Sequence, residues 1–176
     1  RRGIRHLFEL DDPSALPAFI PFLEHDDEWF VDQCVEAIRR WHDGEDSTLL
    51  DRLSSHSSPR IRRLAIEIED RHVDSSEVLD NLRKDKDAEV LKRAWIRSLH
   101  RFSGEKFLGL ANEALESRSV IIRRSAINVA GSRSIDEIVE YGLQDSSPTV
   151  VIESIRFLSK DHPGLIECLQ NGIAIV

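Results

Sequence analysis

A motif of eight residues that recurs five times constrains the fold more than any other feature of this sequence. The five copies align without gaps, and consecutive copies begin between 28 and 32 residues apart. They occupy residues 27–34, 58–65, 87–94, 119–126 and 147–154. A period of this length accommodates two short helices and their connections. It therefore predicts an array of helical hairpins in which each copy of the motif begins the second helix of a hairpin.

Each recurring column of the motif has a physical reason. The first column holds side chains that can accept a hydrogen bond from the free N–H groups of a helix's first turn, namely Asp27, Ser58, Asp87, Ser119 and Ser147. An apolar residue follows three positions later, and a small residue follows four positions after that, so both lie on one helical face. The small residues are Cys34, Ala65, Ala94, Ala126 and Ser154. A leucine stands four or five positions before each cap, at Leu23, Leu53, Leu82, Leu115 and Leu143. We predict that these columns form the core between the helices.

The cap, basic residue and small residue of the motif resemble the second helix of the HEAT-repeat family. The resemblance implies an all-α, right-handed α-α superhelix, or solenoid, of about five HEAT-like hairpins. The hairpins would be residues 11–42, 46–72, 74–102, 104–132 and 134–160, with partial repeats at 1–10 and 162–176. Residues 1–176 would then be a single repeat domain, and we expect it to be a segment of a longer solenoid. In the family, acidic caps and basic residues ladder between repeats. The basic position matches at Arg63, Lys92 and Arg124, while Asp32 and Ile152 replace it in the outer repeats.

Composition excludes several classes of protein. The chain has 40% hydrophobic and 32% charged residues, and none of its uncharged runs approaches the ~20 apolar residues that cross a bilayer. No secretory signal opens it, so we expect a cytoplasmic protein without a membrane partner. Cys34 and Cys168 stand far apart without a CxxC pair, which indicates structural thiols and no zinc site.

Charge is distributed unevenly along the chain. The net charge of −8 argues against a general binder of nucleic acid or anionic membranes, yet residues 87–133 contain nine basic and five acidic residues. In HEAT-like folds the second helices line the concave surface, which would gather basic side chains there. The partner-binding residues predicted on this concave basic stripe are Arg62, Arg63, Lys92, Arg93, Arg97, Arg123, Arg124 and Trp95. Such a stripe would suit an acidic segment of a protein partner or a phosphate backbone.

Each of these candidate residues also has a purely structural interpretation. The arginines could be solvated or could satisfy neighbouring caps and carbonyls. Trp95 has helical spacing from Leu91 and Leu99, which is typical of a core residue. Its position between Arg93 and Arg97 also resembles the HEAT-like DNA glycosylases, which hold a damaged nucleotide with an aromatic side chain. The histidines near the ends of second helices, His42, His72 and His100, suit the helix C-terminal dipole and also a metal or pH-sensing row.

The motifs of catalysis are missing from the sequence. It contains no GxSxG elbow, P-loop, GxGxxG or HExxH. We therefore predict a non-catalytic protein-protein interaction scaffold, without cofactor or metal, that binds a partner segment on the concave second-helix face. The alternative is a nucleic-acid-binding, glycosylase-like module that uses the basic residues between 92 and 133. HEAT-like chromophore lyases, which also cradle a partner protein, are a third resemblance.

Overall fold

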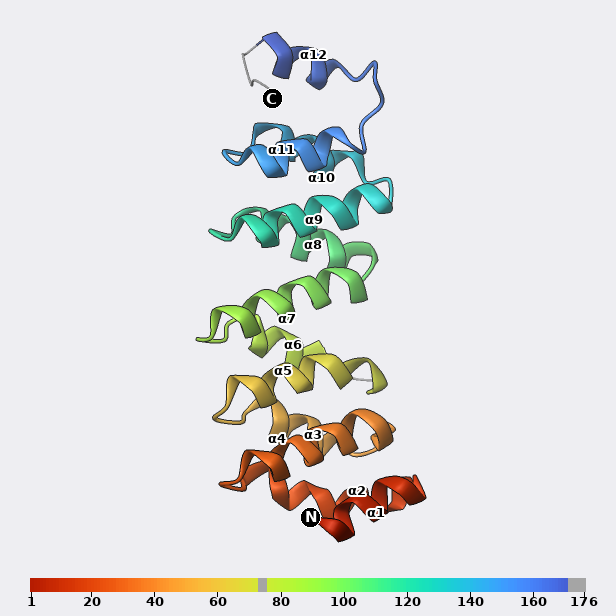
Figure 1. Ribbon diagram of the computed structural model, residues 1–176. Helices are drawn as coiled ribbons and strands as arrows, with labels where there is room; N and C mark the ends of the chain where they lie inside the picture. Colours follow the sequence, from red (N-terminus) through yellow and green to blue (C-terminus); the bar gives the residue numbers. More distant parts are fainter. Residues whose placement is uncertain (73–75, 171–176) are drawn as a thin grey trace. The chain divides into compact units, whose positions relative to one another are not determined.

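The computed structural model describes residues 1–72 and 76–170, and of these the side chains of residue 76 and residues 167–170 are left aside. The described residues form helices and connections only, which confirms the predicted all-α class (Figure 1). The chain divides into two compact units, Arg1–Val90 and Leu91–Val176. None of the described helices combines the length and the apolar character needed to cross a membrane.

Unit 1 begins with a helix and continues as helical hairpins. Its elements are α1 (Arg2–Leu10), η1 (Pro13–Ala15), α2 (Leu16–Phe19), η2 (Ile20–Glu24), α3 (Glu28–Trp41), α4 (Ser47–Ser54), α5 (Pro59–Ile68), η3 (Glu69–Arg71) and α6 (Ser76–Leu82). The first helix of the first hairpin is broken into η1, α2 and η2. The break follows from Pro17 and Pro21, which have no N–H to donate to the preceding turn.

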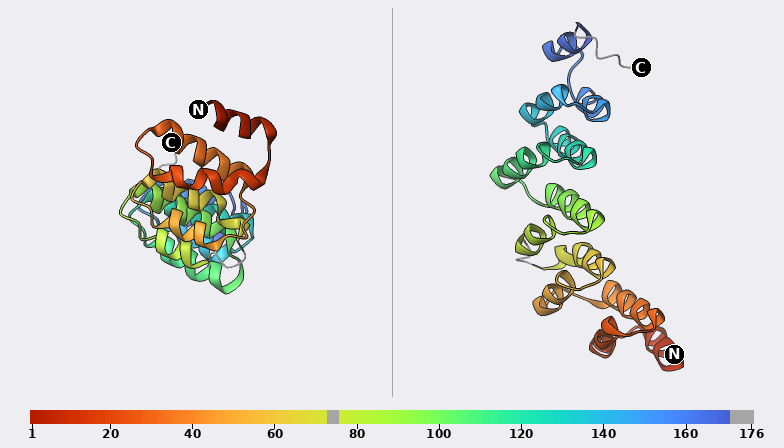
Figure 2. Two further views of the ribbon diagram at one scale, coloured as in Figure 1. Left: turned by 90° about the horizontal axis from the view of Figure 1, so that it is seen from below. Right: turned by 90° about the vertical axis from the view of Figure 1, so that its left-hand side faces the viewer.

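Unit 2 contains the remaining helices. They are α7 (Ala88–Arg101), whose first turn precedes the unit boundary, α8 (Gly104–Leu115), α9 (Val120–Ser132), α10 (Asp136–Tyr141), η4 (Gly142–Gln144), α11 (Pro148–Ile155) and α12 (Pro163–Gln170). Within each unit the first helices of the hairpins form one layer and the second helices form another (Figure 2). The helices pack on their neighbours within and between these layers: α4 packs on α5, while α9 packs on α8, α10 and α11.

The recurring columns of the motif are buried as the sequence predicts. All five small residues have no exposed surface, and the five leucines that precede the caps are buried as well. Small side chains at these positions let neighbouring helices approach closely. Burial also raises the pKa of the Cys34 thiol to about 12, so this cysteine stays protonated and packs as a small apolar residue.

The second helices begin where the sequence places them, but the caps differ in chemistry. Asp27 accepts the N–H of Trp29, and Asp87 accepts the N–H groups of Glu89 and Val90. The serines at the three other caps, Ser58, Ser119 and Ser147, make no such side-chain bond. In those hairpins the extended backbone of the cap residue and, for two of them, a proline at the first helical position set the start of the helix.

Candidate functional site

A second polar column, two residues before each cap, organises the turns that precede the second helices. In every hairpin the side chain at this position accepts the backbone N–H of the cap residue, at 2.7–3.2 Å. The acceptors are His25, His56, Asp85, Ser117 and Asp145. Sequence reasoning missed this column, although its signal was available: a short side chain or imidazole that can accept a hydrogen bond recurs two positions before each cap.

The two aspartates of this column each hold an arginine from the preceding hairpin. In unit 1, Arg62 donates from Nε and Nη2 to the two carboxylate oxygens of Asp85 at 2.6 and 2.8 Å. Its Nη1 donates to the carbonyl oxygens of His56 and Ser57, both at 2.8 Å. The Arg62–Asp85 ion pair joins two successive hairpins, and the guanidinium donates hydrogen bonds from both of its edges. We call this arrangement an Arg–Asp clamp.

Unit 2 contains the same clamp. Arg123 donates to the carboxylate of Asp145 from Nε at 2.7 Å and from Nη2 at 2.9 Å, and its Nη1 donates to the carbonyl oxygen of Ser117 at 2.8 Å. Burial raises the pKa of the Asp145 carboxyl, but the hydrogen bonds from Arg123 and from the N–H of Ser147 outweigh burial and leave that pKa lowered. The hydrogen bond with Asp145 likewise raises the pKa of Arg123.

The clamps change the interpretation of two predicted stripe residues. Arg62 is 5% exposed and Arg123 is 9% exposed, and each guanidinium donates its hydrogen bonds to acceptors inside its own unit. These arginines join neighbouring hairpins and do not present their charge to a partner. In both clamps the arginine stands four residues after a cap and the aspartate two residues before the next cap, so these arginines precede by one position the basic column of Arg63, Lys92 and Arg124 that the resemblance singled out.

The other predicted residues lie in different surroundings. Arg63 is half-buried on α5 in unit 1, whereas Lys92, Arg93 and Arg97 lie on α7 in unit 2, with Arg93 exposed. Trp95 is 7% exposed and belongs to the hydrophobic core of unit 2, as its spacing from Leu99 indicated. The indole therefore packs within the core of unit 2, which agrees with the structural interpretation of its spacing.

Arg124, another predicted residue, lines a pocket. Five residues of α7 and α9 surround a pocket of about 400 Å³ within unit 2: His100, Ile121, Arg124, Ser125 and Asn128. The four residues from α9 are spaced at i, i+3, i+4 and i+7, which is one helical face. Ile121 is 51% exposed, so a large apolar side chain stands in solvent beside a guanidinium. We call this surface the α7–α9 face.

A buried carboxylate holds two polar residues of the α7–α9 face. Glu153 of α11 is 3% exposed and accepts hydrogen bonds from Arg124 at 3.1 Å and from Asn128 at 2.8 Å. Arg156 donates to the same carboxylate at 3.2 Å. Two arginines therefore share one carboxylate, and the excess positive charge faces solvent because the side chains of Arg124 and Arg156 are 55% and 63% exposed.

The histidines behave differently from one another. His42 and His72 are buried, and their Nε2 atoms lie 2.9 Å apart, so one imidazole donates and the other accepts. His100 is exposed and lines the pocket of unit 2. The structure thus brings together the first two members of the predicted row in unit 1, and it places the third on the α7–α9 face.

Comparisons of the chain with protein-family models, with curated protein sequences and with solved structures give no match.

Proposed function

We propose that the hairpins are HEAT-like repeats that stack as a right-handed superhelix. Two observations support this proposal. The same small and leucine columns are buried in all five hairpins, and Arg–Asp clamps join successive hairpins in both units. A ladder of this kind acts between nearest neighbours, which is the way a repeat array is stabilised.

We propose further that the protein is a non-catalytic scaffold whose α7–α9 face binds an acidic, partly apolar segment of a partner protein. The observation that carries this proposal is the exposed Ile121 beside Arg124 and His100 around the pocket. An apolar side chain of the partner would cover Ile121, and a carboxylate would accept hydrogen bonds from the outer edge of the guanidinium. Arg93 and Arg97 of the predicted stripe lie on α7, the helix that also carries His100.

The surroundings of Arg124 favour a protein segment over a phosphate backbone. The guanidinium already shares the Glu153 carboxylate with Asn128 and Arg156, and Arg123, the other arginine of this turn, is buried in its clamp. A nucleic-acid surface gains affinity from many uncommitted cations, whereas this face combines few cations with an exposed isoleucine. Nucleic-acid binding by the basic residues between 92 and 133 is the second candidate, because this segment carries the excess of basic residues described above.

A competition between two probes tests the proposal. Fluorescence anisotropy would compare a labelled peptide of alternating Glu and Leu with a labelled DNA single strand. We expect the peptide to bind, and we expect Ile121→Ser/Arg124→Gln to weaken it about tenfold through the loss of apolar burial and one ion pair. The matched control is Arg118→Gln/Val120→Ser, which removes the same charge and a similar exposed apolar group outside the pocket.

The opposite pattern would select the second candidate. Tighter binding of DNA than of peptide, with an affinity that falls steeply with salt and is lost in Arg93→Gln/Arg97→Gln, would reject the protein-scaffold proposal. Arg123 is left intact in these variants, because its replacement would test folding and not binding.

A further inference from the structure

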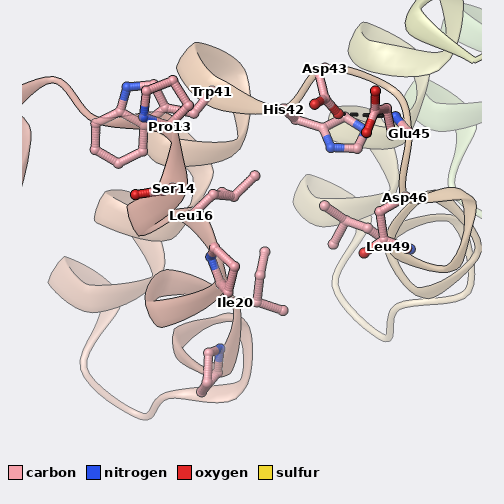
Figure 3. Close-up of a pocket in the computed structure, with 12 residues that line it drawn as sticks. Pro13, Ser14, Leu16, Ile20, Trp41, His42, Asp43, Glu45, Asp46 and Leu49 are labelled. Atoms are coloured by element: carbon pink, nitrogen blue, oxygen red, sulfur yellow. Dashed lines mark hydrogen bonds between the residues drawn. The ribbon is translucent and has the colours of Figure 1, made fainter.

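Unit 1 contains a larger pocket that the proposed function does not use. It has a volume of about 660 Å³, a size typical of ligand sites. Figure 3 shows Pro13, Leu16 and Ile20 on one side of this pocket and His42, Asp46 and Leu49 on the other. The first side comes from the broken first helix η1–α2–η2, with Trp41 at the end of α3 beside Pro13, and the second comes from the loop after α3 and the first turn of α4.

One wall of the pocket is apolar and offers few hydrogen-bond donors. Pro13, Pro17 and Pro21 recur every four residues and all line the pocket, so they share one side of the broken helix. A proline has no N–H, and the indole N–H of Trp41, another lining residue, already donates to Asp11 at 2.9 Å. Leu16, Ile20 and Leu49 complete the apolar surface. This wall fits a bulky apolar group.

The facing loop supplies negative charge. Asp43, Glu45 and Asp46 all line the pocket, and its lining residues include no lysine or arginine. Asp43 and Asp46 use Oδ1 to accept backbone N–H groups of the loop and of α4, at 3.0–3.2 Å, which holds their carboxylates in place. The hydrogen bond from the Thr48 hydroxyl is the main cause of the lowered pKa of Asp46, so this carboxylate stays ionised into the acid range.

A glycine lets the loop pack closely against the backbone of Arg71. Gly44 has φ +93°, and a Cβ added there would overlap the backbone carbonyl of Arg71. The guanidinium of Arg71 donates to the carbonyl oxygens of Ile38, Arg39 and His42 at the end of α3. The carboxylates therefore project from a loop that packs against a residue whose guanidinium is engaged elsewhere.

We propose that this pocket is a second docking site, specific for a partner segment in which an arginine or lysine stands beside a bulky apolar residue. The apolar side chain packs against the proline wall and Leu49, while the cation reaches the carboxylates of Asp43, Glu45 and Asp46. Charge complementarity selects this occupant, because the acidic loop repels the acidic segment proposed for unit 2. The protein thereby recognises two segments of opposite charge on two separate surfaces.

The test uses a short fluorescein-labelled peptide of alternating Leu and Arg. We expect Asp43→Asn/Glu45→Gln, which keeps the shape of the loop, to weaken its binding about tenfold by removing two charges. The matched control is Asp26→Asn/Glu36→Gln, which removes two exposed carboxylates of unit 1 that do not line the pocket. This control should change the affinity by less than about twofold.

A further variant separates docking from attraction to the net negative charge of the chain. Leu16→Ser removes apolar surface from the wall. It should also weaken binding of the Leu–Arg peptide, because the leucine side chains of the peptide pack against this wall. Three outcomes would overturn the proposal. The pocket variant and the control variant could weaken binding of the Leu–Arg peptide equally, the Leu16→Ser variant could bind this peptide as tightly as the wild type, or the wild type could bind a Gly–Arg peptide as tightly as the Leu–Arg peptide. These outcomes leave the acidic-peptide test on unit 2 unaffected, since the two tests use different variants and opposite probes.

Discussion

At the scale of single residues, buried arginines carry the most specific information in this protein. An arginine that is paired bidentately and buried is strongly tied to its partner, and removal of one member leaves an uncompensated charge in the interior. Arg62 and Arg123 meet this description, and their aspartates also order the turn before the next second helix. Each clamp therefore couples two hairpins and one helix start.

The first residue-scale prediction concerns the clamp of unit 2. Arg123→Gln should lower the free energy of unfolding by about 3–5 kcal/mol, because it strands the carboxylate of Asp145, whose side chain is 8% exposed. Urea denaturation followed by circular dichroism measures this. Arg118→Gln, an exposed arginine just before the same helix, should cost less than about 0.5 kcal/mol. The double replacement Arg123→Met/Asp145→Leu should recover part of the loss, and a double variant as unstable as the single one would contradict the clamp.

The second residue-scale prediction concerns the imidazole pair of unit 1. Burial is the main cause that lowers the pKa of His42 below its usual 6.5; His72 and Arg71 lower it further, and Asp43 and Asp46 act in the opposite direction. Just below pH 6.5 the unfolded chain binds a proton that the folded chain does not. The stability contributed by the neutral pair is complete above pH 6.5 and is lost as the pH falls through the folded-state pKa.

Urea denaturation at pH 7.5 and at pH 5.5 measures this dependence. The wild type should lose more stability between the two values than His42→Gln, whose amide can still hydrogen-bond to His72 but does not titrate. Equal losses in the two proteins would show that other groups account for the pH dependence. Comparison with the variant is needed because the difference between the two proteins isolates the contribution of His42 from that of every other titratable group.

At the scale of helices, arginines of a following hairpin cap the C-terminal ends of preceding second helices. In unit 2, Arg133 donates to the carbonyl oxygens of Phe102 and His100 at 2.6 and 2.9 Å, where α7 ends. In unit 1, Arg71 does the same for α3. A cation at this position satisfies free carbonyls and opposes the negative end of the helix dipole.

Loss of this cap should fray the end of α7. We predict that Arg133→Gln lowers the free energy of unfolding by about 1–2 kcal/mol and speeds amide hydrogen exchange at Leu99, His100 and Arg101. Arg133→Lys keeps the charge but has no planar fork with which to bridge both carbonyls, so its exchange rates should lie between those of the wild type and Arg133→Gln. Unchanged exchange in Arg133→Gln would show that packing alone holds the end of the helix.

At the scale of the whole molecule, the Arg–Asp clamps recur with a period of two hairpins. The clamp arginines Arg62 and Arg123 lie 61 residues apart, and the clamp aspartates Asp85 and Asp145 lie 60 residues apart. The three other hairpins have an apolar residue four positions after the cap, at Val31, Leu91 and Val151. The clamps of the described residues therefore recur half as often as the buried columns.

The distribution of charge over the molecule underlies the two binding proposals. Some arginines are engaged in clamps and caps, whereas the side chains of Arg124 on α9 and Arg156 after α11 are more than half exposed in unit 2. The loop between α3 and α4 in unit 1 keeps three carboxylates around an apolar pocket. The overall charge of −8 hides both features, because it averages surfaces of opposite sign.

The sequence by itself determined the helical class, the starts of the five second helices and the buried columns. These features depend on local chemistry: caps, prolines and the spacing of apolar and small residues act within a few positions along the chain. Even here the local signal was incomplete, since the three serine caps are in place without side-chain hydrogen bonds.

Only the tertiary structure decided what the charged residues do. Arg123 and Arg124 are neighbours in the sequence, yet one is buried against Asp145 and the other lines a pocket in solvent, because successive residues of a helix point about 100° apart. The unit 1 pocket escaped sequence reasoning for a related reason. Its proline wall and its acidic loop come from separate elements, and packing of those elements brings together residues whose spacing carries no signal.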